Sequence, residues 1–158
     1  MTAFVRGHPD CFDRSCPPGH VTGSAWIVSA DHRTVLLTLH RKLGRWLQLG
    51  GHADGDPDPL RVALREAREE SGIEHFSVVG DGPLDVDVHE IPAYGRDAAH
   101  LHYDVRWLLV APAGQAVRVS DESHALRWVA VGDLDAVLDE TSLRRMARRA
   151  RTLLTPPG

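Results

Sequence analysis

The sequence has few of the features that mark a secreted, membrane-bound or strongly basic protein. It contains only two cysteines in 158 residues, and it has no run of about 20 apolar residues, the length that crosses a membrane. Its first residues lack the basic stretch and apolar run of a signal peptide. The net charge is −4, so no overall basic field attracts nucleic acid. We therefore expect a cytoplasmic protein with neither a membrane nor nucleic acid as its partner.

The length and composition are those of one globular domain. With 158 residues, 42% of them hydrophobic, the chain can bury roughly 70% of its unfolded surface. We expect a single domain over residues 1–158, with its core at about 20–154 and an N-terminal extension over 1–19. The sequence is also compatible with a homodimer.

The two cysteines, Cys11 and Cys16, lie between His8 and His20. These four residues are of the types that hold zinc, and the two thiols alone could form a disulfide. The spacing is loose for a zinc site, and a reducing cytoplasm keeps thiols free. We therefore do not expect a metal here, and zinc analysis of the purified protein would test this.

Most of the basic residues are arginines, since Lys42 is the only lysine, and five of the arginines cluster near the C-terminus in the stretch LRRMARRAR. Cations suit a helix C-terminus, so a solvated helix end is the first interpretation of Arg144, Arg145, Arg148, Arg149 and Arg151. A patch that contacts phosphate or RNA is the alternative.

Hydrophobic periodicity predicts a mixed sheet with few helices. Strands are expected at 21–29, 34–40, 45–49, 75–80, 84–91, 100–112 and 125–131, and helices at 59–71, 133–138 and 141–154. Strict alternation of strand and helix is absent, which argues against a doubly wound sheet. The expected fold class is α/β (α+β), a mixed β-sheet sandwich flanked by helices.

The helix at 59–71 has clear end signals. Asp58 can cap it, Pro59 suits its first position, and Gly72 can end it. One face is apolar, formed by Leu60, Ala63, Leu64 and Ala67.

Three glutamates, Glu66, Glu69 and Glu70, lie at the C-terminal end of this helix, where the carbonyl dipoles repel negative charge. Glu66 and Glu70 also repel each other at i, i+4, although Arg65 can pair with Glu69 at the same spacing. Carboxylates one turn apart can converge on Mg²⁺, a hard cation that is commonly shared with substrate phosphates. The plainer alternative is a solvated face of arginine and glutamate.

The spacing of these residues favours the metal site. The stretch from Gly51 to Ile73, with Arg65-Glu66-Ala67-Arg68-Glu69-Glu70-Ser71-Gly72-Ile73 at its end, resembles the signature of the Nudix hydrolase superfamily. Those enzymes hydrolyse the pyrophosphate of nucleoside diphosphates linked to another group. Every fixed position matches except one, where Pro57 replaces the first glutamate of the pattern. The order of strands and helices over about 20–154 is compatible with the Nudix fold.

The resemblance implies a chemistry and a set of site residues. Mg²⁺ or Mn²⁺ ions would activate water and neutralise phosphate charge, held by the three glutamates and the carbonyl of Gly50. Glu66 and Glu69 would be catalytic, and Arg65 would orient the glutamates by ion pairing. Glu122, in the loop SDESH with Asp121, is the preferred additional ligand or general base. Glu66 is its rival for the role of base, and a plain turn is the alternative for the loop.

Pro57 leaves one position open. Asp56 or Asp58 could reach the same site from a displaced backbone, which predicts an active enzyme. The rival functions are a Nudix domain that binds a nucleotide without cleaving it, and an RNA-end pyrophosphohydrolase that uses the C-terminal arginines.

The substrate itself is expected to be a small nucleotide. Gly51 and His52 are expected to contact a substrate phosphate, with a structural turn as the alternative for His52. His100 and His102 share one strand face with Asp104 and Arg106, and they would line the substrate cleft unless that face is simply solvated.

Overall fold

The computed structural model describes residues 1–41, 43–93, 95, 98–119 and 123–155. The elements in chain order are α1 (Thr2–Gly7), β1 (Gly19–Val28), β2 (Thr34–His40), β3 (Trp46–Leu47), β4 (Leu49–His52), α2 (Pro59–Ser71), β5 (Ser77–Val78), β6 (Asp85–Ile91), β7 (His100–Val110), β8 (Ser123–Ala130), a 3₁₀ turn η1 (Val131–Asp133), α3 (Leu134–Val137) and α4 (Thr141–Leu154). The mixed α+β class predicted from the sequence is confirmed, as is a single domain.

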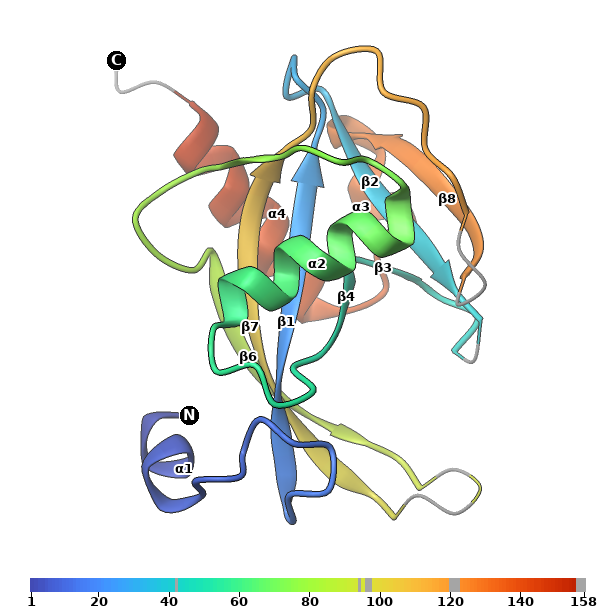
Figure 1. The fold of residues 1–158 in the computed structure, drawn as a ribbon. Coiled ribbons are helices and arrows are strands. Elements are labelled where there is room, and N and C mark those ends of the chain that lie inside the picture. The colour runs from blue at the N-terminus through green and yellow to red at the C-terminus, as the bar shows by residue number, and fades with distance from the viewer. Residues whose placement is uncertain (42, 94, 96–97, 120–122, 156–158) are drawn as a thin grey trace.

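The strands form one mixed sheet around β1 and β7 (Figure 1). These two strands pair in parallel along their whole length, and all other strand pairs are antiparallel. The other edge of β1 pairs with β4 at Thr22–Ala25 and with β2 at Ile27–Val28. The sheet therefore branches along β1, and the branch brings the glycine-rich strand β4 beside the middle of β1.

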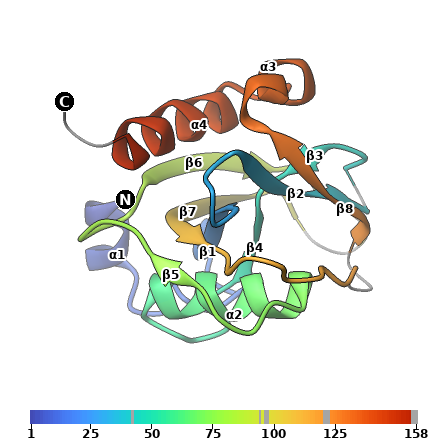
Figure 2. The same ribbon diagram turned by 90° about the horizontal axis from the view of Figure 1, so that it is seen from above.

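Helices cover both faces of the sheet. In Figures 1 and 2, α2 crosses one face of β1 and β7, and α4 lies on the opposite side. Ile27 and Leu36 pack with Ala67 of α2, whereas Trp26 and Leu108 pack in the cluster that contains Met146 of α4. Successive residues of β1 thus serve different cores, as the alternation of a strand requires. No helix among the described residues is long and apolar enough to cross a membrane.

The N-terminal segment packs against the sheet, and its helix α1 was not predicted. Phe4 stacks on Tyr103 with ring centroids 3.7 Å apart, and both free cysteines are buried in the same cluster. Burial raises the pKa of Cys16 to about 11, with a smaller contribution from Asp10. Within the described residues, Cys11 and Cys16 do not form a metal-binding group with His20. The cysteines are therefore core residues.

Two predicted elements are divided in the structure. The strand expected at 45–49 is the short strand β3 followed by β4, which continues through Gly50 and Gly51 to His52. The helix expected at 133–138 is a 3₁₀ turn followed by one turn of α-helix. The glycine pair stays extended because it pairs with Gly23 and Ser24 of β1, a long-range contact that local pattern does not reveal.

Candidate metal and substrate site

The glutamate cluster, defined as Glu66, Glu69 and Glu70, owes its position to the way α2 begins and ends. The side chain of Asp58 accepts hydrogen bonds from the backbone N–H groups of Leu60 and Arg61, and Gly72 ends the helix with a left-handed φ of 72°. Both predicted caps are confirmed. Val62, Ala63 and Ala67 are buried beneath the helix, so the carboxylates lie along the edge of its buried face.

The three carboxylates differ in exposure, and two of them touch β4. Glu70 is only 7% exposed, and its Oε1 accepts a hydrogen bond of 2.7 Å from the backbone N–H of Gly50. Glu66 is 12% exposed and lies against Gly51, where an added Cβ would be 2.5 Å from Cδ of the glutamate. Glu69 is exposed. The glycine strand therefore lies directly beside this end of the helix, and a side chain at Gly51 would displace Glu66.

Arg65 binds a different glutamate from the one predicted. Its Nη2 donates to Glu66 Oε1 at 2.8 Å and to the carbonyl oxygen of His52 at 2.6 Å. The predicted i, i+4 pair with Glu69 is not formed between these two described residues. The guanidinium reaches back to the last residue of β4, and this geometry favours the adjacent glutamate. Arg65 thus joins the helix to the strand and holds the Glu66 carboxylate.

Both aspartates beside Pro57 have partners at the start of α2. Asp58 caps α2, and Asp56 receives hydrogen bonds from the guanidinium of Arg61, including one of 2.6 Å to its Oδ2. A hydrogen bond from Arg61, followed by one from the backbone of Asp58, lowers the pKa of Asp56 to about 2. The cap also lies about 12 Å along the helix axis from Glu66, at 1.5 Å per residue. Both carboxylates therefore accept hydrogen bonds from residues in the first turn of the helix.

Two predicted residues cannot be placed. Glu122 and Asp121 lie outside the described residues, which resume at Ser123 with β8. Their roles as additional ligand or base stay predictions.

Five histidines gather at one end of the sheet. This histidine cluster contains the predicted His52, His100 and His102 together with His89 and with His20, which the sequence had grouped with the two cysteines instead. The strand register explains it, because β1 places His20 beside His102 and β6 places His89 beside His102. Only a knowledge of this register would have joined residues so far apart in the chain.

His20 is buried, and the other four histidines of the cluster are half-buried. Burial lowers the pKa of His102 to about 2, and nearby histidines lower it further. Burial also lowers the pKa of His52 to about 4, with a contribution from the charge of Arg14. His20 is 2% exposed, and neither of its ring nitrogens has a hydrogen-bond partner. Burial, and then the charge of His100, also lowers the pKa of His20.

The rest of this sheet face carries a buried ion network, formed by Asp85, Asp87, Asp104 and Arg106. Arg106 donates to Asp104 at 2.7 Å and to each of the other two carboxylates at 3.3 Å. Asp104 and Arg106 are each 2% exposed. The predicted common face of the two histidines with Asp104 and Arg106 is correct. The alternative of a solvated face is wrong for Asp104 and Arg106, which are buried, whereas His100 and His102 are half-buried.

The C-terminal arginines complete this network. Arg145 donates to Asp85 at 2.6 Å and to Asp87 at 2.8 Å, and Arg149 pairs with Asp85 as well. Arg144 donates to the carbonyl of Leu138 at 2.8 Å. The predicted solvated helix end therefore holds only in part, because Arg144 and Arg149 are exposed yet bind the protein itself, and Arg145 is half-buried. The alternative of a patch that contacts phosphate or RNA stays a prediction.

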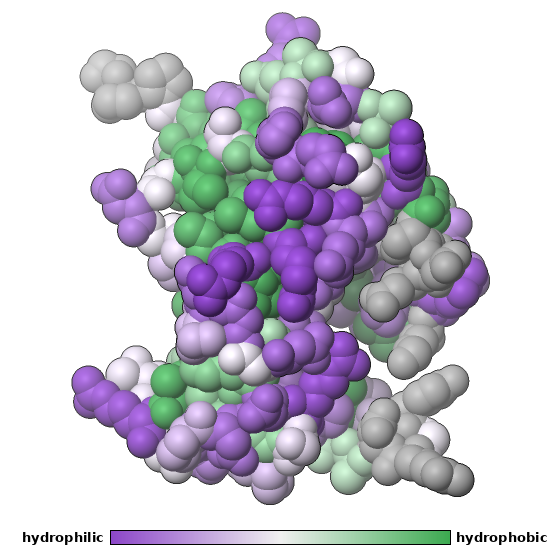
Figure 3. All heavy atoms as spheres, viewed as in Figure 1, coloured by the Kyte–Doolittle hydropathy of each residue, from purple (hydrophilic) through white to green (hydrophobic). Residues whose placement is uncertain are grey.

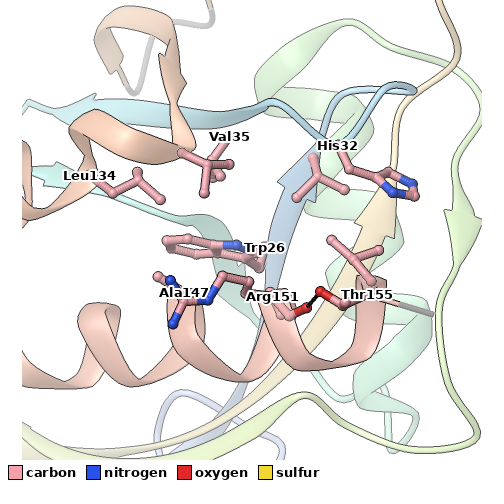
Figure 4. A pocket seen from close by; sticks show the side chains of 11 residues that line it. Trp26, His32, Val35, Leu134, Ala147, Arg151 and Thr155 are labelled. Carbon is pink, nitrogen blue, oxygen red and sulfur yellow. Dashed lines mark hydrogen bonds between the residues drawn. The ribbon is translucent and has the colours of Figure 1, made fainter. Parts of the chain in front are cut away.

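Two cavities in the described part of the chain lie away from the glutamate cluster, and one of them, of about 310 Å³, is lined by residues that include Phe76, Val110 and Pro112. The other cavity, of about 150 Å³, lies between Trp26, Val35, Leu134 and the C-terminal half of α4 (Figure 4). Its volume is below the roughly 300–1,000 Å³ usual for ligand pockets, and no member of the glutamate cluster lines it. Hydrophilic side chains instead cover the face over α2 in Figure 3.

The donor set at the end of α2 fits a hard divalent cation. Three carboxylates lie within two turns of one helix, beside the glycine backbone of β4, and one guanidinium compensates part of their charge. Oxygen ligands of this kind suit Mg²⁺ and Mn²⁺. A bound cation would relieve the mutual repulsion of the carboxylates.

Comparison with known proteins agrees with the resemblance seen in the sequence. A model of the NUDIX domain family matches residues 19–150. No curated protein matches the sequence.

Several solved structures share the fold. The Ap4A hydrolase of C. elegans, in a binary complex, has a TM-score of 0.69 at 20% identity, covering 85% of this chain and 96% of that one. A NUDIX family hydrolase from Clostridium perfringens has 0.68 at 22%, covering 85% and 97%. The E. coli dihydroneopterin triphosphate pyrophosphohydrolase has 0.66 at 15%, covering 84% and 95%.

Proposed function

The chain belongs to the Nudix family of hydrolases, and from this premise we propose that it cleaves a pyrophosphate bond in a nucleoside diphosphate derivative by attack of water on phosphorus. The reaction would depend on Mg²⁺ or Mn²⁺. The observation that carries the proposal is the contact of Glu66 and Glu70 with the glycine strand β4, which supports carboxylates that local helix energetics disfavour.

The glutamate cluster and Gly50 would hold the cation. When bound, such a cation neutralises phosphate charge and makes water a better nucleophile near neutral pH. Glu70 fixes the strand by accepting from the N–H of Gly50, and Arg65 positions the carboxylate of Glu66. Glu122 is proposed as a further ligand or as the base that takes the proton from water, and Glu66 is the second candidate for that base.

The substrate is proposed to approach along β4. Gly51 and His52 immediately precede the loop to α2, where the carbonyl of His52 is held by Arg65. A phosphate at this point would meet Gly51 backbone and the His52 ring. Two of the structurally similar enzymes are named for their substrates, Ap4A and dihydroneopterin triphosphate. Dinucleoside polyphosphates and nucleoside triphosphate analogues are therefore the first substrate classes to test.

The test is a panel of nucleoside diphosphate derivatives with Mg²⁺ or Mn²⁺. Wild type should release phosphate-containing products, and Glu69→Gln should lose turnover by at least about a hundredfold, as expected for loss of a metal ligand. Glu74→Gln is the matched control, because Glu74 is an exposed glutamate just beyond α2. Tight nucleotide binding without turnover across the panel would instead establish a binding domain.

Several expectations stay predictions. They are the division between the core at 20–154 and the extension over 1–19, the homodimer and the cytoplasmic location. Their tests are limited proteolysis, sedimentation and fractionation of cells.

A further inference from the structure

The histidine cluster contains a feature that the proposed hydrolysis does not use. His20 is almost completely buried, yet both of its ring nitrogens lack a hydrogen-bond partner. Leaving a buried donor or acceptor unsatisfied costs about 1–3 kcal/mol. A polar ring in this position needs either a ligand or a compensating contact.

Two other histidines converge on the same point. One ring nitrogen from each of His20, His100 and His102 lies within 4.8 Å of the other two. The Nε2 atoms of His100 and His102 are 3.3 Å apart. Two nitrogens bound to one tetrahedral zinc at about 2.05 Å would themselves be separated by about 3.3 Å. This pair therefore already has the spacing of one edge of a zinc coordination tetrahedron.

The backbone fixes this arrangement. His20 and His102 face each other across the parallel pair β1 and β7, and His100 lies two residues earlier on the same face of β7. Ligands on paired strands form a rigid scaffold, in which only the side-chain torsions need to adjust. His52 flanks the group, with its ring centroid 5.0 Å from that of His20.

We propose that His20, His100 and His102 bind a transition-metal ion, Zn²⁺ being the ion that this donor set favours. Three imidazoles with a water molecule in the fourth position form a common tetrahedral zinc environment, and an all-nitrogen set is unsuited to Mg²⁺. The site is separate from the glutamate cluster. It assigns His100 and His102 to a metal and not directly to the substrate.

The site can be tested with Co²⁺ as a spectroscopic substitute for zinc. The full-length protein, stripped with chelator, is titrated with Co²⁺ in excess Mg²⁺, which competes for the carboxylates. We expect about one equivalent to bind with the intense visible absorption of tetrahedral Co²⁺, and Zn²⁺ to abolish it. No tetrahedral spectrum, or no Zn²⁺ displacement, would overturn the proposal.

Variants then locate the ion. His20→Asn should weaken Co²⁺ binding at least about tenfold, whereas the exposed His75→Asn should leave it unchanged. Unchanged binding by folded His20→Asn would overturn the proposal. If circular dichroism shows that His20→Asn is unfolded, His100→Asn replaces it with the same expected result and the same contradiction.

Two further variants exclude other sites. Glu69→Gln should retain the tetrahedral spectrum, which separates this ion from the catalytic one and makes the result independent of hydrolysis. Cys11→Ser should retain it too, with no thiolate charge-transfer band in wild type. Loss of the spectrum in either variant would overturn the histidine assignment.

Discussion

At the scale of single residues, Arg65 is the most exacting position of the candidate site. One nitrogen, Nη2, binds both Glu66 and the carbonyl of His52, so it fixes a carboxylate relative to the end of β4. Lysine has a compact charge on a flexible stem and does not reproduce this geometry. We expect Arg65→Lys to lower kcat/KM by about 10- to 100-fold, with Mn²⁺ affinity reduced and the thermal midpoint unchanged.

Arg68→Lys is the control for this substitution. Arg68 is exposed in the next turn and donates to the backbone of Glu74, away from the carboxylates. Equal activity losses in the two variants would show that Arg65 has no special positioning role.

The residues of the site were predictable only in part. Glu66, Glu69 and Glu70 were singled out from sequence because they break local helix rules at fixed spacing, and their role as metal ligands stays a prediction. The partner of Arg65 was predicted wrongly, since the i, i+4 rule does not include a strand that packs beside the helix. His20 was missed as a member of its cluster because its neighbours lie about 80 positions away, and only strand register brings them together.

At the scale of elements, the close approach of β4 to α2 should be essential to activity but not to folding. A Cβ on Gly51 would overlap the Glu66 carboxylate, which is the far end of a flexible side chain and can move. A displacement of about 1 Å in a catalytic group can cost about 100-fold in rate. Gly51→Ala should therefore lose at least about tenfold in kcat while remaining folded by circular dichroism.

The matched control is Gly132→Ala, because an added Cβ there meets nothing within 4 Å. Full activity in Gly51→Ala would mean that Glu66 does not need its observed position.

Asp58, at the start of α2, lies next to Pro57, the position at which the chain departs from the Nudix signature. If Asp58 only caps the helix, Asp58→Asn should keep both stability and turnover, since asparagine caps equally well. Asp58→Ala should lower the free energy of unfolding by about 1 kcal/mol, with turnover within about threefold of wild type. Urea unfolding and steady-state kinetics measure the two effects. A large loss of turnover in Asp58→Asn would make this carboxylate part of the active site.

Elements with strong local signals were predicted best. The helices α2 and α4 have the predicted bounds, and α2 has cap residues at both ends. The split between β3 and β4 was missed because it depends on pairing with two different strands, β2 and β1. Local pattern carries no information about such partners.

At the scale of the whole molecule, the buried ion network joins α4 to the sheet. The side chain of Asp85 is fully buried and pairs with Arg106, Arg145 and Arg149. Removing one partner from a buried pair leaves an uncompensated charge and typically costs about 3–5 kcal/mol. Asp85→Ala should lower the free energy of unfolding by about that amount, measured by urea denaturation.

Asp139→Ala serves as the control, since Asp139 is exposed and surface substitutions usually change stability by less than about 0.5 kcal/mol. A similar small effect in Asp85→Ala would show that the network is replaceable. The sequence suggested solvated arginines here because it gives no sign that α4 lies over β6, a contact that the fold creates.

The central claim is hydrolysis of a pyrophosphate bond by water at the end of α2. The most direct test is the reaction of the panel substrates in H₂¹⁸O with Mg²⁺, followed by mass spectrometry of the products. We predict one ¹⁸O atom per turnover in a phosphate-containing product, with the rate of labelling at least about a hundredfold lower in Glu69→Gln and no labelled product with excess chelator. Cleavage without ¹⁸O in any phosphate product, or the same labelling in Glu69→Gln, would contradict the account.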